Sequence, residues 1–477
     1  MSRFKPTPGR TPAPFRSAAE PKSSPARGTA VANRPLALTP FALQTPNGGV
    51  ALEEHVKDPA LRATIVNTTR QMAFSFTIAF IYARFSFIHE FLAGYFWIDF
   101  HILLIIGSLA MLTCLASGQL LSGLSSPAVR VWVAFFGFMC VASVFSTWRG
   151  NSVDVLSAYA RTNMPLLLLI PGVAVTGAEI KKIINTIAYA GATTIVLGRF
   201  SDSFTSGRLE IETAAGTIQN PNDFAALLIL ILPAIAYWTF QKDRNLFLRI
   251  AGIGLMGLGA VELVGTGSRG ALVALMAMGA YLLVRGSTKL RLALIVGVPL
   301  LIGAILPFAP SSALDRMTSL VASKETVEAA ESREARIALF NASIDITFHH
   351  PLFGIGPGEF MDYQGGMAAA KGQHGMWHQT HNGYTQISSE CGLPAALCFL
   401  AGIFMTMRSL RRSTKANIPF ISGIARTFSV MMVGYAVCLI FLSQAYSFVP
   451  PVLCAIALAI ERYVESVRSV NAPAAAP

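Results

Sequence analysis

Apolar stretches long enough to cross a membrane recur along this sequence from about residue 71 to residue 461. A helix of about twenty apolar residues spans the roughly 30 Å of hydrocarbon in a bilayer, whereas a soluble chain of this length would interrupt such stretches with polar connections. Only 13% of the 477 residues are charged, against roughly 25% in soluble globular domains. The sequence therefore predicts an all-α, polytopic membrane protein.

Twelve membrane-spanning helices are predicted from the apolar windows. Their approximate extents are 71–88, 98–117, 131–147, 161–177, 183–199, 222–240, 248–266, 270–284, 290–308, 392–408, 427–445 and 447–461. The predicted parts of the chain are a tail at 1–70, spans one to nine at 71–308, a long connection at 309–391, spans ten to twelve at 392–461, and a second tail at 462–477.

The placement of basic residues predicts the orientation of these spans. Lys and Arg gather in the connections that are cytoplasmic when the N-terminus is inside, for example at Lys181, Lys182, Arg411 and Arg412, and they are fewer in the other connections. Short cytoplasmic loops carry such an excess. We therefore expect both termini in the cytoplasm and the connection at 309–391 on the outer face.

The first seventy residues differ from the rest, being rich in Pro, Ser, Ala and Thr without an apolar run long enough for a signal peptide. This composition predicts a disordered cytoplasmic tail that is suited to recruiting a cytoplasmic partner. The net charge of +12 does not indicate binding to nucleic acid, because no basic stripe with interleaved aromatic residues is present. The six cysteines form no CxxC pair and are interpreted as small core residues.

The connection at 309–391 is expected to be functional, because loops of this length usually are functional or disordered. It contains five of the eight histidines, and it includes a predicted amphipathic helix from Ala329 to Phe348. The apolar residues that recur there at a spacing of three or four are Ile337, Phe340, Ile344 and Phe348. Such a helix can lie on the bundle or on the membrane surface. Proton chemistry on the outer face is therefore expected in this connection.

Several motifs follow one another in the second half of the chain. The connection reads SREARIALFNASIDITFHHPLFGIGPGEF and then HQTHNGYTQISSECGLPAALCFL, while the upstream stretches are GTGSRGALVAL and, after Arg208, GTIQNPNDFAALLILILP. Together they resemble the O-antigen ligase and Wzy-type polysaccharide polymerase superfamily over roughly residues 71–461. The matching positions in the connection are Arg336, Phe340, Pro351, Leu352, Gly354, Gly356, His381, Asn382, Tyr384, Glu390 and Gly392. The family often has Trp where this chain has Phe340.

The resemblance implies a GT-C-like fold of about twelve transmembrane helices with one large extracytoplasmic loop that contains helices. It implies a membrane glycosyltransferase in the bacterial inner membrane. Such an enzyme takes a glycan from an undecaprenyl-pyrophosphate-linked donor and joins it to a hydroxyl of an acceptor glycan or of lipid A-core. The expected partners are therefore these lipid-linked glycans and the surrounding membrane lipids. Neither a metal nor another cofactor is implied.

Arg208, Arg269 and Arg336 are predicted to bind the donor pyrophosphate, because all three fall on the outer side of the predicted topology. A planar guanidinium binds phosphate oxygens bidentately and stays charged. Arg269 lies in the turn GTGSRG between two apolar spans, where a cation is costly unless an anion meets it. The alternative is that Arg269 extends to the lipid headgroups.

His381 is the predicted catalytic base, because a neutral imidazole can accept a hydroxyl proton near pH 7. Asn382, Tyr384 and Glu390 are predicted to support it. The alternative role of His381 is to cap the helix that follows. Two asparagines of the upstream NPND motif, Asn220 and Asn222, either cap a helix or contact the donor sugar.

A zinc site is the other interpretation of these histidines. His374, His378 and His381 are four and three residues apart and would share one face of a helix. Nearby glycines weaken a helix in this stretch, and no HExxH motif is present. The sequence therefore favours a catalytic base over a metal site.

Polymerisation of exopolysaccharide or O-antigen repeat units is the favoured function, because the long connection shows no second basic cluster for a phosphorylated lipid acceptor. An O-antigen ligase that joins polymer to lipid A-core is the first alternative. A polysaccharide flippase or exporter would also have about twelve spans, but more often shows paired intramembrane charges or inverted repeats. A non-enzymatic assembly scaffold is the remaining alternative.

Overall fold

The computed structural model describes residues 59–200, 203–205, 208–211, 217, 218, 220–308, 327–370, 372 and 377–471. The chain divides into two units, 1–39 and 40–477, and every described residue belongs to the second. The predictions for residues 1–58, 309–326 and 472–477 therefore lie outside the described residues. So does His374, one of the three histidines of the zinc interpretation.

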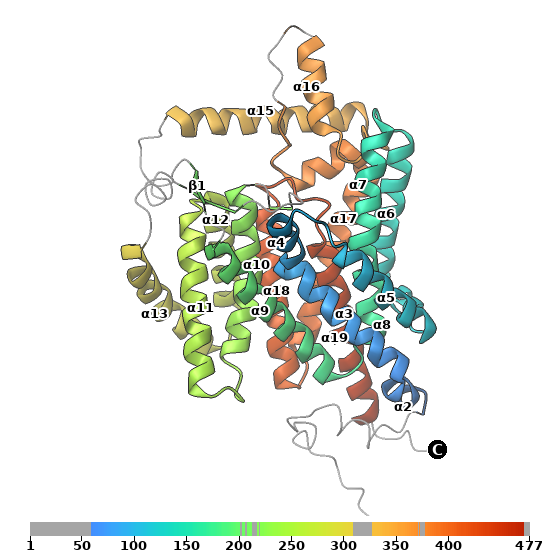
Figure 1. Ribbon diagram of the computed structural model, residues 1–477, viewed down its shortest axis with the longest axis vertical. Helices are drawn as coiled ribbons and strands as arrows, with labels where there is room; N and C mark the ends of the chain where they lie inside the picture. The colour runs from blue at the N-terminus through green and yellow to red at the C-terminus, as the bar shows by residue number, and fades with distance from the viewer. Residues whose placement is uncertain are drawn as a thin grey trace, which may run out of the picture. The chain divides into compact units, whose positions relative to one another are not determined.

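The described residues form α-helices with short connections and one small hairpin (Figure 1). The helices are α2 (Pro59–Val66), α3 (Thr68–Ser86), α4 (Ile88–Phe96), α5 (Ile102–Ala116), α6 (Pro127–Val144), α7 (Arg149–Thr162), α8 (Met164–Val173), α9 (Gly177–Phe200), α10 (Pro221–Thr239), α11 (Leu246–Gly265), α12 (Arg269–Arg285), α13 (Thr288–Ile305), α15 (Val327–His349), α16 (Phe360–Ala370), α17 (Gly383–Thr414), α18 (Pro419–Cys438) and α19 (Val449–Asn471). The 3₁₀ helices are η1 (Leu120–Ser125) and η2 (Leu306–Phe308), and the antiparallel strands are β1 (Ser203–Thr205) and β2 (Arg208–Glu210).

Six described helices are long and apolar enough to cross a membrane, namely α6, α9, α10, α11, α17 and α18. A seventh span results if α3 and α4, which are bent by 66° at their junction, are counted as one. The protein is therefore an all-α membrane protein. Each of the twelve predicted spans overlaps a helix, but several of these helices are short, for example α8 with 10 residues. The count of twelve spans remains a prediction.

Short polar side chains fix where several long helices begin. Asn67, Asn220, Asn245, Ser268 and Asn382 precede α3, α10, α11, α12 and α17, and each accepts hydrogen bonds from backbone amides of the first turn. Such caps satisfy amide groups that have no partner inside the helix. The predicted capping role of Asn220 is confirmed. The three caps before α10, α12 and α17 also place the starts of these helices at the site described below.

The core lies around α10, which packs against α9, α11, α12 and α18. Its side chains are buried on all sides, including Phe224 and Leu228, because an apolar helix surrounded by other helices has no polar face. Helix α13 is the opposite case, since Leu292, Ile295 and Leu300 are all more than half exposed. Exposed aliphatic side chains in this number are expected of a helix that faces lipid.

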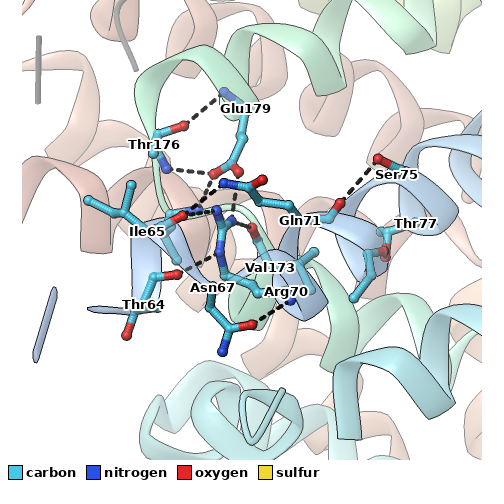
Figure 2. Close-up of polar contacts among 12 residues, drawn as sticks. Thr64, Ile65, Asn67, Arg70, Gln71, Ser75, Thr77, Val173, Thr176 and Glu179 are labelled. Atoms are coloured by element: carbon cyan, nitrogen blue, oxygen red, sulfur yellow. Dashed lines mark hydrogen bonds and ion pairs between the residues drawn. The ribbon is translucent and has the colours of Figure 1, made fainter. Parts of the chain in front are cut away.

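A buried arginine joins α3 to α8 and α9 near α2 (Figure 2). The guanidinium of Arg70 donates to the carbonyl oxygens of Thr64, Ile65 and Val173 and to Glu179 Oε1 at 2.6 Å. The second oxygen of Glu179 accepts the amides of Val175 and Thr176 at the start of α9. Because every charge is paired, this cluster is a structural connection. It lies at the end of the bundle opposite α15 (Figure 1).

Helix α15 is present where an amphipathic helix is predicted, but it packs on α17 through a different stripe. Leu339, Ser343 and Ile346 are buried, whereas Ile337 and Phe340 of the predicted stripe are 51% and 41% exposed. Two apolar stripes with the same spacing exist on this helix, and the turn after it decides between them. That turn holds α15 so that Thr347 meets Ser388 of α17, with their hydroxyl oxygens 2.8 Å apart.

Candidate functional site

A pocket of about 430 Å³ is lined by residues of α15 and of the starts of α12 and α17. Its polar lining consists of Arg208, Asn222, Ser268, Arg269, Arg333, Arg336, Thr380, His381 and Asn382. Its apolar lining includes Val273, Ile337, Phe340, Ile440, Phe441 and Leu442. None of the described residues that line this pocket is acidic. We call it the arginine pocket.

The arginine pocket collects residues from five separate stretches of the chain, 208–222, 267–273, 333–340, 380–382 and 438–442. Arg208 stands at the start of β2, and its Nε donates to the carbonyl of Thr266 at 2.8 Å while a terminal nitrogen donates to Asn222 at 2.9 Å. These bonds hold the guanidinium between the end of α11 and the start of α10. Arg269 is the first residue of α12, and only three residues separate it from the end of α11. The predicted turn between these two apolar helices is therefore confirmed.

Helix N-termini add to the positive potential of the pocket. Asn222 belongs to the first turn of α10, Arg269 and Ala271 to that of α12, and Asn382 caps α17. The amide groups at a helix start carry partial positive charge and favour anions. With four arginines on the same lining, the pocket is suited to an anion with several oxygens.

His381 is held rigidly in a backbone conformation that few residues other than glycine adopt, with φ at 51°. Its amide donates to Ser443 Oγ at 2.8 Å, and the amide of the following Gly383 donates to the carbonyl of Leu439 at 2.7 Å. Thr380 Oγ1 lies 3.1 Å from the same Ser443 hydroxyl. The connection between α18 and α19 thus fixes the histidine at the pocket. Strained backbone of this kind is concentrated at functional sites.

The surroundings keep the imidazole of His381 neutral. Burial, together with the neighbouring Arg336 and His378, lowers its pKa to about 4. A neutral imidazole has a free lone pair at pH 7 and can accept a proton. His381 is therefore in the protonation state that a general base requires before substrate binds.

Residues 254–400 of this chain match the sequence model of the O-antigen ligase family. This stretch of the chain is therefore similar to an O-antigen ligase domain. No curated protein matches the chain in sequence.

The stretch that matches the O-antigen ligase model contributes Arg269, Arg333, Arg336 and His381 to the pocket. Arg208 and Asn222 come from the part of the chain before it, and Ile440, Phe441 and Leu442 from the part after it. Segments on both sides of the matched domain therefore complete the pocket. Any catalytic test needs the full chain for this reason.

Three of the predicted supporting residues lie outside the pocket lining. The carboxylate of Glu390 is buried and accepts the hydroxyl of Tyr446 at 2.6 Å and the amide of Gly358 at 2.8 Å. Tyr384 donates its hydroxyl to the carbonyl of Ala436 at 2.7 Å, and Asn220 caps α10. Glu390 and Tyr384 therefore make structural contacts that hold α17 in place.

Arg333 is the pocket residue that sequence reasoning missed. It precedes Arg336 by three residues, and residues three apart on a helix share a face. That spacing is the signal in the sequence that places Arg333 beside Arg336 on α15. The described residues contain no group of three His, Cys, Asp or Glu side chains placed to hold a metal ion.

Replacing Gly354 with alanine is expected to destabilise the protein by about 2 kcal/mol or more. Gly354 has a φ of +67°, and a Cβ there would overlap the backbone of Glu390. The turn would therefore lose its contact with α17, because the amides of Ile355 and Gly356 in the turn bond the carbonyls of Ser389 and Glu390. Thermal unfolding in detergent measures the effect. Gly366→Ala is the control, because its Cβ would meet nothing within 4 Å, and equal melting temperatures would contradict the prediction.

Proposed function

We propose that this protein transfers a glycan from an undecaprenyl-pyrophosphate-linked donor to an acceptor sugar hydroxyl on the outer face of the bacterial inner membrane. The observation that carries the proposal is the pocket in which four arginines and three helix N-termini meet His381. The pyrophosphate is the part of the donor that needs such a cluster of positive charge. The apolar side chains on the same lining suit the first isoprene units.

The reaction follows from the two kinds of residue in the arginine pocket. The acceptor hydroxyl loses its proton to His381 as its oxygen forms a bond with the anomeric carbon of the donor glycan. The bond from that carbon to the pyrophosphate oxygen breaks at the same time, and undecaprenyl pyrophosphate leaves. Arg208, Arg269, Arg333 and Arg336 stabilise the charge that grows on the leaving oxygen.

The orientation in the membrane is part of the proposal. The pocket residues come from the connections before α10, α12 and α17 and after α18. The basic connections lie at other helix ends. Ion pairs are found there between Lys181 and Asp243 at 2.9 Å and between Arg412 and Glu461 at 3.7 Å. These basic connections support a cytoplasmic position for the helix ends that carry them and an outer position for the pocket.

A cysteine at Ala369 is expected to react with a membrane-impermeant maleimide in cells with a permeabilised outer envelope, whereas one at Lys415 is expected to react only after lysis. Both residues are exposed, on α16 and directly after α17 respectively. The protein without an introduced cysteine is the control for its six native thiols. The reverse labelling pattern would place the arginine pocket in the cytoplasm and refute the proposed orientation.

Glycan analysis of a deletion strain tests the function in the cell. We propose polymerisation of exopolysaccharide or O-antigen repeat units, which predicts that the strain accumulates donor lipid with a single repeat unit. Accumulation of full-length polymer on the lipid would assign the same chemistry to a ligase that uses lipid A-core as acceptor. Normal polymer, retained on the inner leaflet, would contradict glycan transfer and indicate export.

A further inference from the structure

A second pocket, of about 490 Å³, adjoins the arginine pocket. Residues that are consecutive in the chain line different pockets. Asn222 and Leu442 line the arginine pocket, whereas the residues that follow them, Asp223 and Ser443, line the second pocket. The wall between them is therefore thin. Ser443 Oγ, which lines the second pocket, accepts the hydrogen bond from the amide of His381 at 2.8 Å.

The second pocket presents the groups that bind carbohydrate. Phe448 offers an aromatic face, while Asp223, Gln444 and the phenol of Tyr435 offer acceptors and donors. Gln444 donates to Asp223 Oδ1 at 3.0 Å, so the carboxylate and the amide are held in a fixed relation across the pocket. Sugars have apolar C–H faces that pack on aromatic rings and hydroxyls that both donate and accept. This lining matches both properties.

Arg84 gives the second pocket a positive charge. Its guanidinium lies 4.5 Å from the centre of the Phe448 ring, and its buried Nε has no hydrogen-bond partner among the described residues. A buried guanidinium donor without a partner is costly, and a cation over an aromatic ring recovers only part of the lost hydration. An anionic group in the pocket would satisfy it.

We propose that the second pocket binds the acceptor glycan and that Arg84 contacts an acidic group on that glycan. The inference rests on the proposed function, because it assigns the second substrate of the same reaction. With the donor pyrophosphate in the arginine pocket, the bulk of the acceptor glycan lies in the second pocket, behind Ser443, whose Oγ bonds the amide of His381. For transfer, the reacting hydroxyl extends past this wall into the arginine pocket, which the imidazole of His381 lines. The two substrates would thus occupy separate pockets on either side of one wall.

Steady-state kinetics on the full chain in lipid nanodiscs test this assignment. The probes are a lipid-linked donor repeat unit and a soluble acceptor oligosaccharide of the same acidic repeat. Arg84→Met is expected to raise the KM for the acceptor about tenfold or more, since a charged hydrogen bond is lost. The KM for the donor and the turnover number at saturating acceptor are expected to stay near the wild-type values. Lys182→Met is the matched control, because Lys182 lies over the ring of Phe74 outside the pocket.

A second variant keeps the test valid if Arg84→Met fails to fold. Ala158 of α7 is exposed and lines the second pocket, so Ala158→Trp fills the pocket from its edge. Val153→Trp on the same helix, at an exposed position outside the lining, is its control. Only Ala158→Trp is expected to raise the KM for the acceptor.

The outcomes separate this inference from the proposed function. If the wild-type chain transfers glycan but the folded pocket variants leave the acceptor KM unchanged, the second pocket is not the acceptor site. A rise in the donor KM alone would assign the pocket to the donor glycan, and rescue of Arg84→Met by a change of lipid headgroup would assign it to lipid. Absence of transfer by the wild-type chain would instead overturn the proposed function itself.

Discussion

Replacing His381 with alanine is expected to lower the turnover number about a hundred- to ten-thousandfold, which is the usual effect of losing a general base. Binding of the lipid-linked donor is expected to remain, because the arginines hold the pyrophosphate whether or not the base is present. Turnover and donor binding are measured on the same purified protein. His378→Ala is the control, since His378 is exposed and does not line the pocket. Near-normal turnover of His381→Ala would refute the base assignment.

The pH profile gives an independent readout of the same histidine. Because the pKa of His381 is lowered to about 4, the free protein loses its base only as the pH falls through that value. On the acid side of the profile, kcat/KM should therefore stay constant as the pH falls from about 8 to 5. A bound pyrophosphate raises the pKa of a neighbouring imidazole, so the acid limb of kcat should lie at higher pH. An identical acid limb in His381→Ala would assign the titration to another group.

Replacing Arg269 with lysine is expected to reduce kcat/KM almost as strongly as replacing it with alanine, each by roughly ten- to a hundredfold. Arg269 stands at the start of α12 and at the pocket, where a planar fork can bond two phosphate oxygens while a lysine offers one point charge. Donor-dependent kinetics measure the loss, with the amount of each variant in the membrane determined in parallel.

Arg411→Lys, at an exposed position near the end of α17, is the control and is expected to behave as wild type. If Arg269→Lys retains most of the activity, Arg269 supplies only a positive field or an anchor to lipid headgroups. That result would favour the alternative role considered for this residue from the sequence.

Local signals in the sequence predicted much of the fold. The apolar windows predicted where α10, α11 and α12 lie, and the NPND motif predicted the cap before α10. Two features escaped prediction because each involves only a few residues. The α3–α4 bend occurs at Phe87, whose φ is +52°, and the hairpin of β1 and β2 is only three residues long on each side. Neither leaves a periodic pattern.

For the candidate site, motifs and residue chemistry predicted the lining together. Arg208, Arg269, Arg336 and His381 lie in or beside the motifs of the family resemblance, their roles followed from their chemistry and their predicted side of the membrane, and the structure brings them to one pocket. Glu390 was chosen for its place in a motif, yet its carboxylate bonds the turn at Gly358 and the hydroxyl of Tyr446. A motif alone does not distinguish a residue that meets substrate from one that holds the motif in shape.

Reconstitution tests the central claim most directly. The purified full chain in proteoliposomes is given an undecaprenyl-pyrophosphate-linked repeat unit, and the products are analysed by mass spectrometry. We expect glycans of two or more repeat units together with one free undecaprenyl pyrophosphate for each bond formed, and neither product with His381→Ala. Donor that remains a single unit on its lipid, or that only changes leaflet, would contradict glycan transfer in the arginine pocket.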